Sequence, residues 1–331
     1  INFNKKLKIS TGAYNNSDAK NSSINQTLST QEKQFLSQIG NNIDSARYPN
    51  ATPDTFSINK ILYRRSDTTY NGINDTIYRY SVNQNDTLYS LSFTNVGPGN
   101  GDYIAVNDGN ANGRVFQWVQ PVNGARHGDW DPVILLVTPK KHDLITAAAE
   151  YTISKNSSLK AEMALSNYDV NTFSSKGKDA NKGLAAKVNY VMQHKVLESL
   201  KPGLALQTNV GYEFVEDKFR PLETLRNVEF NRDWSLSFNA PAATENLLNA
   251  SLQLKDQQDN FLKYQFTNYD RSDQYRGIRN SIDNVMDIKG WHFANKFYVT
   301  HINSLKQQGS YLRPSIDLYK SFAGLKNVKI G

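Results

Sequence analysis

The sequence contains no cysteine, which excludes disulfide bonds, zinc–thiolate sites and cysteine nucleophiles together. It also lacks a long hydrophobic run, because the longest apolar stretch, Val133 to Val137, is far below the roughly 18 residues of a membrane-spanning helix. Lysine and arginine are scattered, and a net charge of +7 over 331 residues does not indicate a nucleic-acid partner. The fold must therefore be stabilised by apolar burial and hydrogen bonds.

Aromatic residues, in contrast, are plentiful. The chain has 18 Tyr and 15 Phe, with 21% charged residues, which is too aromatic for a disordered chain and rather polar for a globule with a thick core. Its length allows either two ordinary domains or one large β architecture. This composition favours a β protein rich in asparagine and tyrosine.

One short helix is predicted in the first part of the chain. Ser29 and Glu32 have the spacing of a capping box, Phe35, Leu36 and Ile39 share one helical face, and Gly40 follows as a terminator. The helix should span residues 30–39. Its apolar face is expected to pack on a neighbouring sheet.

The rest of residues 1–139 has the pattern of a turn-rich β region. Short apolar alternations run from Ser57 to Phe93, separated by Asn, Asp and Gly. Two Gly-Asp-aromatic triplets follow, Gly101-Asp102-Tyr103 and Gly128-Asp129-Trp130. Because the pattern changes at Pro139, we expect a domain boundary there, with 140–331 as the second part.

Residues 140–331 contain longer strands with regular alternation. Leu159, Met163 and Leu165 alternate with polar neighbours, as expected for antiparallel hairpins with one apolar and one polar face. Strands are predicted at 144–153, 158–168, 183–193, 204–215, 227–239, 247–254, 260–269, 291–301 and 311–322. The predicted fold class is all-β: an antiparallel meander of long hairpins, part of a large sheet or β-barrel, preceded by a smaller turn-rich β region with one short helix.

No recognisable catalytic motif is present. The sequence has no Gly-x-Ser-x-Gly elbow and no His-Glu-x-x-His zinc motif. Carboxylates such as Asp129 and Asp131 could act as an acid–base pair, but turn solvation is the more frequent role of such residues. We therefore expect no enzyme, no catalytic residues and no required cofactor.

The strongest ligand-like cluster is a run of carboxylate and amide side chains with intervening glycines. Oxygen ligands on a tightly turning backbone suit Ca²⁺, although this spacing differs from an EF-hand, and an ordinary Asn/Asp/Gly turn cluster is the more frequent explanation of such a run. The candidate calcium ligands are Asp102, Asn107, Asp108, Asn110 and Asn112.

Aromatic residues near the glycine-rich turns form a second candidate site. Tyr103, Trp118 and Trp130 could provide a platform on which a sugar ring stacks. The alternative is that they pack in the core or at the rim of β-hairpins. Trp130 is the better candidate of the two tryptophans, because it lies in a predicted turn.

Three blocks of sequence resemble large, uncharacterised cell-envelope proteins of Bacteroidota. They are Phe93 to Tyr103, Asn112 to Val119 and Gly128 to Val133, and the strand-rich stretch after Pro139 resembles a continuation of the same proteins. The resemblance implies a location at the outer membrane or cell surface, with no catalytic residues to carry over. The chain is also expected to be a processed or excised piece of a longer one.

These observations favour a non-enzymatic, extracytoplasmic β protein that acts as a scaffold or as a component of a surface or secretion assembly. Its expected partners are other envelope proteins or the rest of a longer chain, with glycan and outer-membrane lipid as further possibilities and no nucleic acid. A carbohydrate- or peptide-binding surface module and a hydrolase built on a β scaffold are the alternatives. The sequence leaves open whether the apolar faces of the strands meet lipid or another protein layer.

Overall fold

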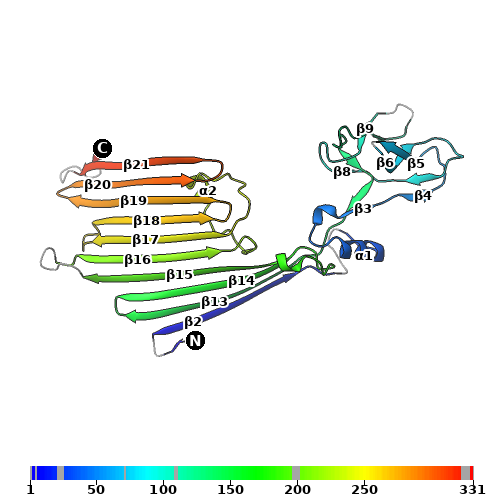
Figure 1. Cartoon of the computed structure of the whole chain (residues 1–331). Helices are drawn as coiled ribbons and strands as arrows, with labels where there is room; N and C mark the ends of the chain where they lie inside the picture. Colours follow the sequence, from blue (N-terminus) through cyan, green and yellow to red (C-terminus); the bar gives the residue numbers. More distant parts are fainter. Residues whose placement is uncertain are drawn as a thin grey trace. The chain divides into compact units, whose positions relative to one another are not determined.

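The computed structural model describes residues 2–3, 6–20, 26–70, 72–107, 111–195, 202–321 and 329–330. The chain forms two compact units (Figure 1). The first, which we call the sheet unit, comprises residues 1–17, 141–169 and 177–331. The second, the inserted unit, comprises residues 18–140 and 170–176.

This division differs at the N-terminus from the single boundary expected after residue 139. Residues Leu7–Ser17 form a strand, β2, that pairs with the first strand after the expected boundary, from Ser17 opposite Lys141 to Leu7 opposite Tyr151. Residues 1–17 therefore belong to the sheet unit. The weak alternation of this segment does not reveal which later strand it pairs with.

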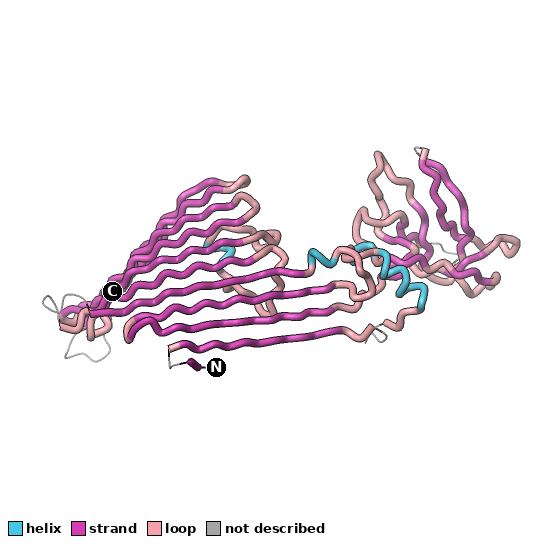
Figure 2. The backbone as a smooth tube through the Cα atoms, turned by 60° about the horizontal axis from the view of Figure 1, so that its bottom comes forward, coloured by secondary structure: helices cyan, strands magenta, loops and turns pink. Residues whose placement is uncertain are grey.

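The sheet unit contains one antiparallel sheet in which the strand order follows the sequence. Figure 2 shows its strands side by side in one continuous twisted layer. This arrangement confirms the predicted all-β meander. The strands in order are β1 (Asn2–Phe3), β2, β13 (Lys141–Ser154), β14 (Ser157–Asp169), β15 (Lys182–Lys195), β16 (Ala205–Val215), β17 (Glu245–Lys255), β18 (Phe261–Arg271), β19 (Tyr275–Ile288), β20 (Trp291–Asn303), β21 (Gln308–Ser321) and β22 (Lys329–Ile330).

The connections differ between the two ends of the sheet. At one end, short turns at 155–156, 256–260 and 289–290 close three of the hairpins. At the other end, β2 continues into residues 18–140, β14 into 170–181, which includes the short 3-10 helix η2 (Lys178–Ala180), and β16 into 216–244, whereas the turns at 272–274 and 304–307 are short. We call the latter the long-connection end.

The predicted strand over residues 227–239 is wrong. This segment contains a short helix, α2 (Phe230–Asp233), and turns, and Ser235 adopts a positive φ of 50° that interrupts any strand. Trp234 is buried, whereas Phe238 is 85% exposed, so the alternating aromatic residues do not share an environment. The alternation of apolar and polar residues in this segment therefore does not reflect a β-strand.

The predicted helix near the start of the inserted unit is confirmed. Helix α1 (Thr30–Gln38) begins with the expected capping box between Ser29 and Glu32. Leu36 on its apolar face packs with Ala46 and Leu136. The buried Asn171 side chain donates to the carbonyls of Leu36 (2.8 Å) and Gly40 (2.7 Å), which satisfies acceptors at the end of the helix.

Two small antiparallel sheets make up most of the remaining inserted unit. The first has the order β4 (Thr52–Asp54), β7 (Leu88–Ser90), β5 (Tyr63–Tyr70), β6 (Ile73–Tyr80), and the second has the order β10 (Val115–Trp118), β9 (Tyr103–Val106), β11 (Trp130–Asp131), β8 (Thr94–Asn95). A third pair joins β3 (Arg47–Pro49) to β12 (Val133–Leu135), and the short helix η1 (Ile43–Ser45) precedes β3.

Aromatic side chains join the first two sheets. The Phe93 ring lies 5.2 Å from that of Tyr63, 5.0 Å from that of Tyr103 and 4.4 Å from that of Phe116. The Phe116 amide donates to the Tyr63 hydroxyl at 3.1 Å, and the Tyr78 amide donates to the Tyr103 hydroxyl at 2.8 Å. Burial raises the pKa of Tyr63 to about 12. The buried hydroxyls of Tyr63 and Tyr103 therefore each accept a hydrogen bond from a backbone amide within this aromatic core.

The two Gly-Asp-aromatic triplets pair with each other. Gly101 and Gly128 exchange two backbone hydrogen bonds of 2.9 Å. A Cβ atom on Gly101 would lie 2.5 Å from the backbone of Trp130, and one on Gly128 would lie 2.4 Å from the backbone of Tyr103. Glycine is required at both positions because the two backbones approach too closely for any side chain.

We predict that Gly101→Ala and Gly128→Ala each lower the free energy of unfolding of the inserted unit by about 3 kcal/mol, because the new methyl group meets backbone atoms that cannot rotate away. Gly124→Ala is the matched control. Gly124 has a positive φ of 80° but open space around it, so its substitution should cost only about 1 kcal/mol. Urea unfolding of the three variants measures these changes in the free energy of unfolding. Equal losses of stability in all three would contradict the explanation by close backbone approach.

Candidate functional site

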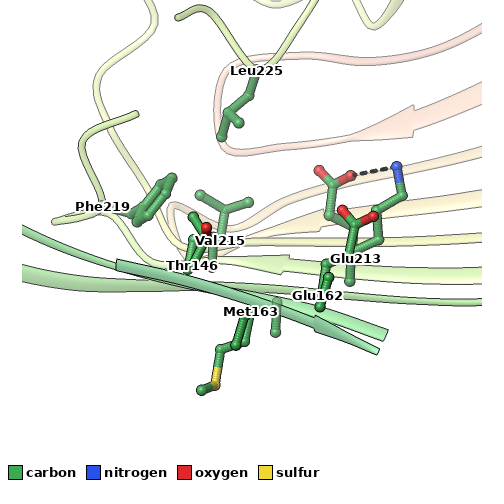
Figure 3. Close-up of a pocket in the computed structure, with 13 residues that line it drawn as sticks. Thr146, Glu162, Met163, Glu213, Val215, Phe219 and Leu225 are labelled. Carbon is green, nitrogen blue, oxygen red and sulfur yellow. Dashed lines mark ion pairs between the residues drawn. The ribbon is translucent and has the colours of Figure 1, made fainter. Parts of the chain in front are cut away.

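Strand register divides the side chains of the large sheet into two sets. Residues that are directly opposite in antiparallel strands point to the same face. Ile145, Leu165 and Leu184 lie in one such row, on what we call the apolar face. Glu150, Lys160 and Asn189 lie in another row, on what we call the polar face. Figure 3 shows this alternation locally, because Met163 points away from the side that carries Thr146 and Glu162.

The apolar face is exposed over most of the sheet. Strands β13–β21 contain exposed large hydrophobic side chains that lie opposite a residue of a neighbouring strand. All of these side chains belong to the apolar face. Exposed apolar patches of this extent are unusual on soluble proteins. The exposed side chains are Ile145, Tyr151, Leu159, Met163, Leu165, Val188, Val210, Tyr212, Leu248, Leu252, Leu254, Leu262, Tyr264, Ile282, Ile288, Trp291, Phe297, Leu312, Ile316 and Leu318.

Several polar side chains on the apolar face hydrogen-bond to one another. The Tyr264 hydroxyl donates to Asn280 at 2.7 Å, and the Tyr212 hydroxyl donates to Asn246 at 2.5 Å. Asn295 donates to Asn284 at 3.4 Å. These amides therefore have protein partners on a face that is mostly apolar.

The charged residues of the apolar face lie near the strand ends. Lys141 pairs with Asp143 there, and Arg276 pairs with Asp270.

The polar face carries charged and amide side chains in the middle of its strands. Opposite charges are often adjacent there: Lys160 lies 2.9 Å from Glu162, and Lys187 lies 3.8 Å from Glu213. The charged residues of this face in β13–β21 are Glu150, Lys160, Glu162, Lys187, Glu213, Glu245, Lys255, Lys263, Arg271, Arg279, Asp283, Asp287, Lys296, Arg313 and Asp317.

Residues 216–244, which we call the covering segment, fold back over the polar face at the long-connection end. Two glycines of the sheet make room for it. A Cβ atom on Gly183 would lie 2.2 Å from the backbone of Phe219, and one on Gly277 would lie 2.7 Å from the Trp234 ring. Trp234 is 3% exposed and packs with Tyr269, Tyr275 and Ile302. The covering segment is therefore docked through apolar contacts.

Polar contacts fix α2 within the covering segment. The Tyr275 hydroxyl donates to the Trp234 carbonyl at 2.6 Å, and the Arg279 guanidinium donates to the Asp233 carbonyl. Arg313 pairs with the Asp233 carboxylate at 3.1 Å. The Arg279 guanidinium also lies over the Trp234 ring at 4.3 Å, and burial lowers the pKa of Arg279.

An ion-pair network lies at the base of the covering segment. Arg226 contacts both Glu213 and Glu245, the latter at 2.8 Å, and Arg271 contacts Glu245 at 3.2 Å and Asp273 at 2.9 Å. The Arg271 side chain is 4% exposed, and its hydrogen bond holds the pKa of Asp273 below the usual value. Because Arg271 is buried, its charge depends on these partners.

A cavity of about 470 Å³ lies between the covering segment and strands β13–β16 (Figure 3). Its floor includes the small side chains of Ala148, Ala164 and Ala185. Phe219 and Leu225 of the covering segment stand over one side, and Glu162 with the Lys187–Glu213 pair stand at the other. The cavity therefore has an apolar side and a charged side.

The structure brings the three predicted stacking residues together but places them against the core. Tyr103 is directly opposite both Trp118 and Trp130 in the register, so all three share one face. Tyr103 is 3% exposed and offers no ring face to a ligand, which corrects the prediction for this residue. Trp118 contacts Tyr70, and Trp130 contacts Phe116 and Arg114, with both tryptophans half-buried.

The predicted calcium ligands are only partly described. Asp108 and Asn110 lie outside the described residues, and Asn107 and Asn112 are exposed. Asp102 pairs with Arg126, which also contacts the buried Asp131 at 3.1 Å. Burial raises the pKa of Asp102. Within the described residues, no group of three His, Asp or Glu side chains has the geometry to hold a metal ion.

Comparisons with known proteins gave no match to any family model, curated protein or solved structure. In the residues that the structure describes, no helix has the length and apolar character to cross a membrane.

Sequence reasoning missed the covering segment and the ion pairs beneath it. The alternation of Leu159 to Leu165 with charged neighbours does indicate two chemically different faces. Gly183 and Gly277, placed inside strands, are signals of close backbone approach that could have located the docking points.

We predict that Arg271→Met lowers the free energy of unfolding by about 2 kcal/mol, because it removes a buried guanidinium that pairs with Asp273 and donates to the Pro241 carbonyl. The substitution leaves Glu245 paired with Arg226 alone among the described residues. It should also move the pKa of Asp273 up towards its usual value. Lys255→Met is the control, because the Lys255–Asp259 pair is exposed and should contribute less than about 1 kcal/mol. Chemical denaturation and NMR titration measure the two effects, and a cost no larger than that of the control would contradict the assigned role.

Proposed function

We propose that this chain is a non-enzymatic cell-envelope protein whose large sheet contacts outer-membrane lipid through its apolar face and water through its polar face. The exposure of large aliphatic and aromatic side chains across β13–β21, all on one face, carries this proposal. An aqueous setting would leave this face hydrated at a cost of about 25 cal/mol for each Å² of apolar surface.

Strand length is consistent with this setting. Strands β13–β21 have 11 to 14 residues each. A tilted strand needs about 9–11 residues to cross the hydrocarbon core. The backbone groups of strands β13–β20 are paired with neighbours on both sides, as a lipid environment requires.

The polar residues on the apolar face also support the proposal. Asn246, Asn280 and Asn284 each accept a hydrogen bond from a residue on the same face. Such pairing lowers the cost of placing an amide in hydrocarbon. At a strand end, the Lys320 ammonium lies 5.0 Å from the Trp291 ring, a combination typical of the boundary between lipid and water.

The chain connections suggest which end of the sheet faces outward. Membrane sheets of this kind have short turns on one side and long connections on the outer side. The inserted unit joins the sheet unit at the long-connection end. We propose that it is a surface module and that the whole chain serves as a scaffold or a component of a surface assembly.

We predict that the full chain, diluted from urea into phosphatidylcholine–phosphatidylglycerol vesicles, floats with the vesicles in a density gradient. Leu252→Lys should reduce the folded, vesicle-bound fraction, because a lysine on a lipid-facing position costs about 2–4 kcal/mol near the bilayer centre. Gln253→Lys is the matched control, since Gln253 is the next residue and lies on the polar face.

Three results would contradict the proposal. The first is a soluble, monomeric chain that folds without lipid or detergent. The second is an equal loss of vesicle binding in Leu252→Lys and Gln253→Lys. Stable pairing of two copies through the apolar face in plain buffer would instead assign that face to a protein layer and would also contradict lipid contact.

A further inference from the structure

The centre of the polar face contains a hollow whose lining includes four amide side chains, with charged side chains at its rim. It lies over strands β15–β18, has a volume of about 330 Å³ and is separate from the apolar part of the cavity in Figure 3. We call its central side chains the amide patch: Asn189, Asn209, Asn249, Ser251 and Gln265.

Strand register brings these residues together. Asn209, Ser251 and Gln265 lie in one cross-strand row. In the next row, Gly211 lies between Asn189 and Asn249. A Cβ atom on Gly211 would lie 2.9 Å from the Asn189 Oδ1 atom, so the missing side chain gives the Asn189 amide room to lie across β16. Glycine therefore contributes to the hollow itself.

One side of the amide patch is held in place by the buried Thr267. Its hydroxyl donates to Asn249 Oδ1 at 2.8 Å and accepts from Gln265 Nε2 at 3.4 Å. Among the described residues, the side chains of Asn189, Asn209 and Ser251 have no protein hydrogen-bond partner. The hollow therefore contains half-buried amide and hydroxyl groups that can donate hydrogen bonds to a ligand and accept them from it.

Charge lies at the rim of the amide patch and is balanced there. Lys187 pairs with Glu213 at one side, and Lys263 is directly opposite Asp283 at the other. The centre has no net charge. Binding of a strongly charged ligand is therefore disfavoured, since its charge would meet uncharged amides.

We propose that the amide patch binds a neutral, polyhydroxylated ligand, namely one or two rings of an uncharged oligosaccharide. Each sugar hydroxyl can donate and accept, as can each amide, so the two surfaces match. The hollow is at the small end of ligand-pocket volumes, which suits short saccharides better than an extended peptide. The inference rests on the proposed function only in requiring that the polar face is open to water.

The test uses the full chain in detergent micelles on an array of uncharged glucan, mannan and galactan oligosaccharides, with a peptide array in parallel. Binding to at least one oligosaccharide is expected, with affinity reduced about tenfold, or about 1.4 kcal/mol, in Asn209→Leu, because the hydrogen bonds of the Asn209 amide to the ligand are lost. Gly211→Ala is a second variant, in which the new methyl group displaces the Asn189 amide, and it should weaken binding similarly.

Asn295→Leu is the matched control, since it makes the same exchange on the opposite face. It should bind oligosaccharide as the unchanged chain does, and vesicle flotation of each variant shows separately whether lipid contact is retained. Absence of oligosaccharide binding, or binding that survives both Asn209→Leu and Gly211→Ala, would overturn the inference even where flotation succeeds. Peptide binding that is lost in Asn209→Leu would overturn it as well, because it would assign the patch to peptides.

Discussion

Strand register in the large sheet is the constraint on which the rest of this structure depends. Side chains alternate between faces with a period of two, so a slip of one residue would exchange the two sets completely. A one-residue shift of β17 would bring Leu252 to the polar face and Gln253 to the apolar face. Apolar exposure, the ion pairs and the amide patch all follow from the same register.

The polar face shows how glycine shapes such a sheet without changing its hydrogen bonding. Gly183 and Gly277 let the covering segment approach the strands, and Gly211 opens the amide patch. In the inserted unit, Gly101 and Gly128 permit two backbones to pair at close range. At Gly101, Gly128 and Gly183 a side chain would meet backbone atoms, whereas at Gly211 it would displace the Asn189 amide.

Local patterns predicted much of the fold. The helix from Thr30 follows from its capping box, and strands such as Ser157–Asp169 follow from alternation, because both signals lie within a few neighbouring residues. The alternation in residues 227–239 predicts a strand that does not form, because Trp234 packs on Gly277 from the end of a short helix. The pairing of β2 with β13 was not predictable, since more than 120 residues separate the paired segments.

The candidate site was less predictable than the fold. Tyr103, Trp118 and Trp130 do come together, but as part of a core that depends on contacts with Phe93 and the neighbouring sheet. The amide patch was invisible in the sequence, because Asn189, Asn209 and Gln265 lie on three different strands. Only the register places them side by side.

Because the chain has no native cysteine, single cysteines can report the environment of each face directly. Leu252→Cys and Gln253→Cys place a thiol on adjacent residues that point to opposite faces. After reconstitution in vesicles, labelling with a water-soluble maleimide should be fast for Gln253→Cys and slow for Leu252→Cys, with detergent solubilisation as a control for protein integrity. Equal labelling rates in vesicles would contradict the claim that the two faces meet lipid and water.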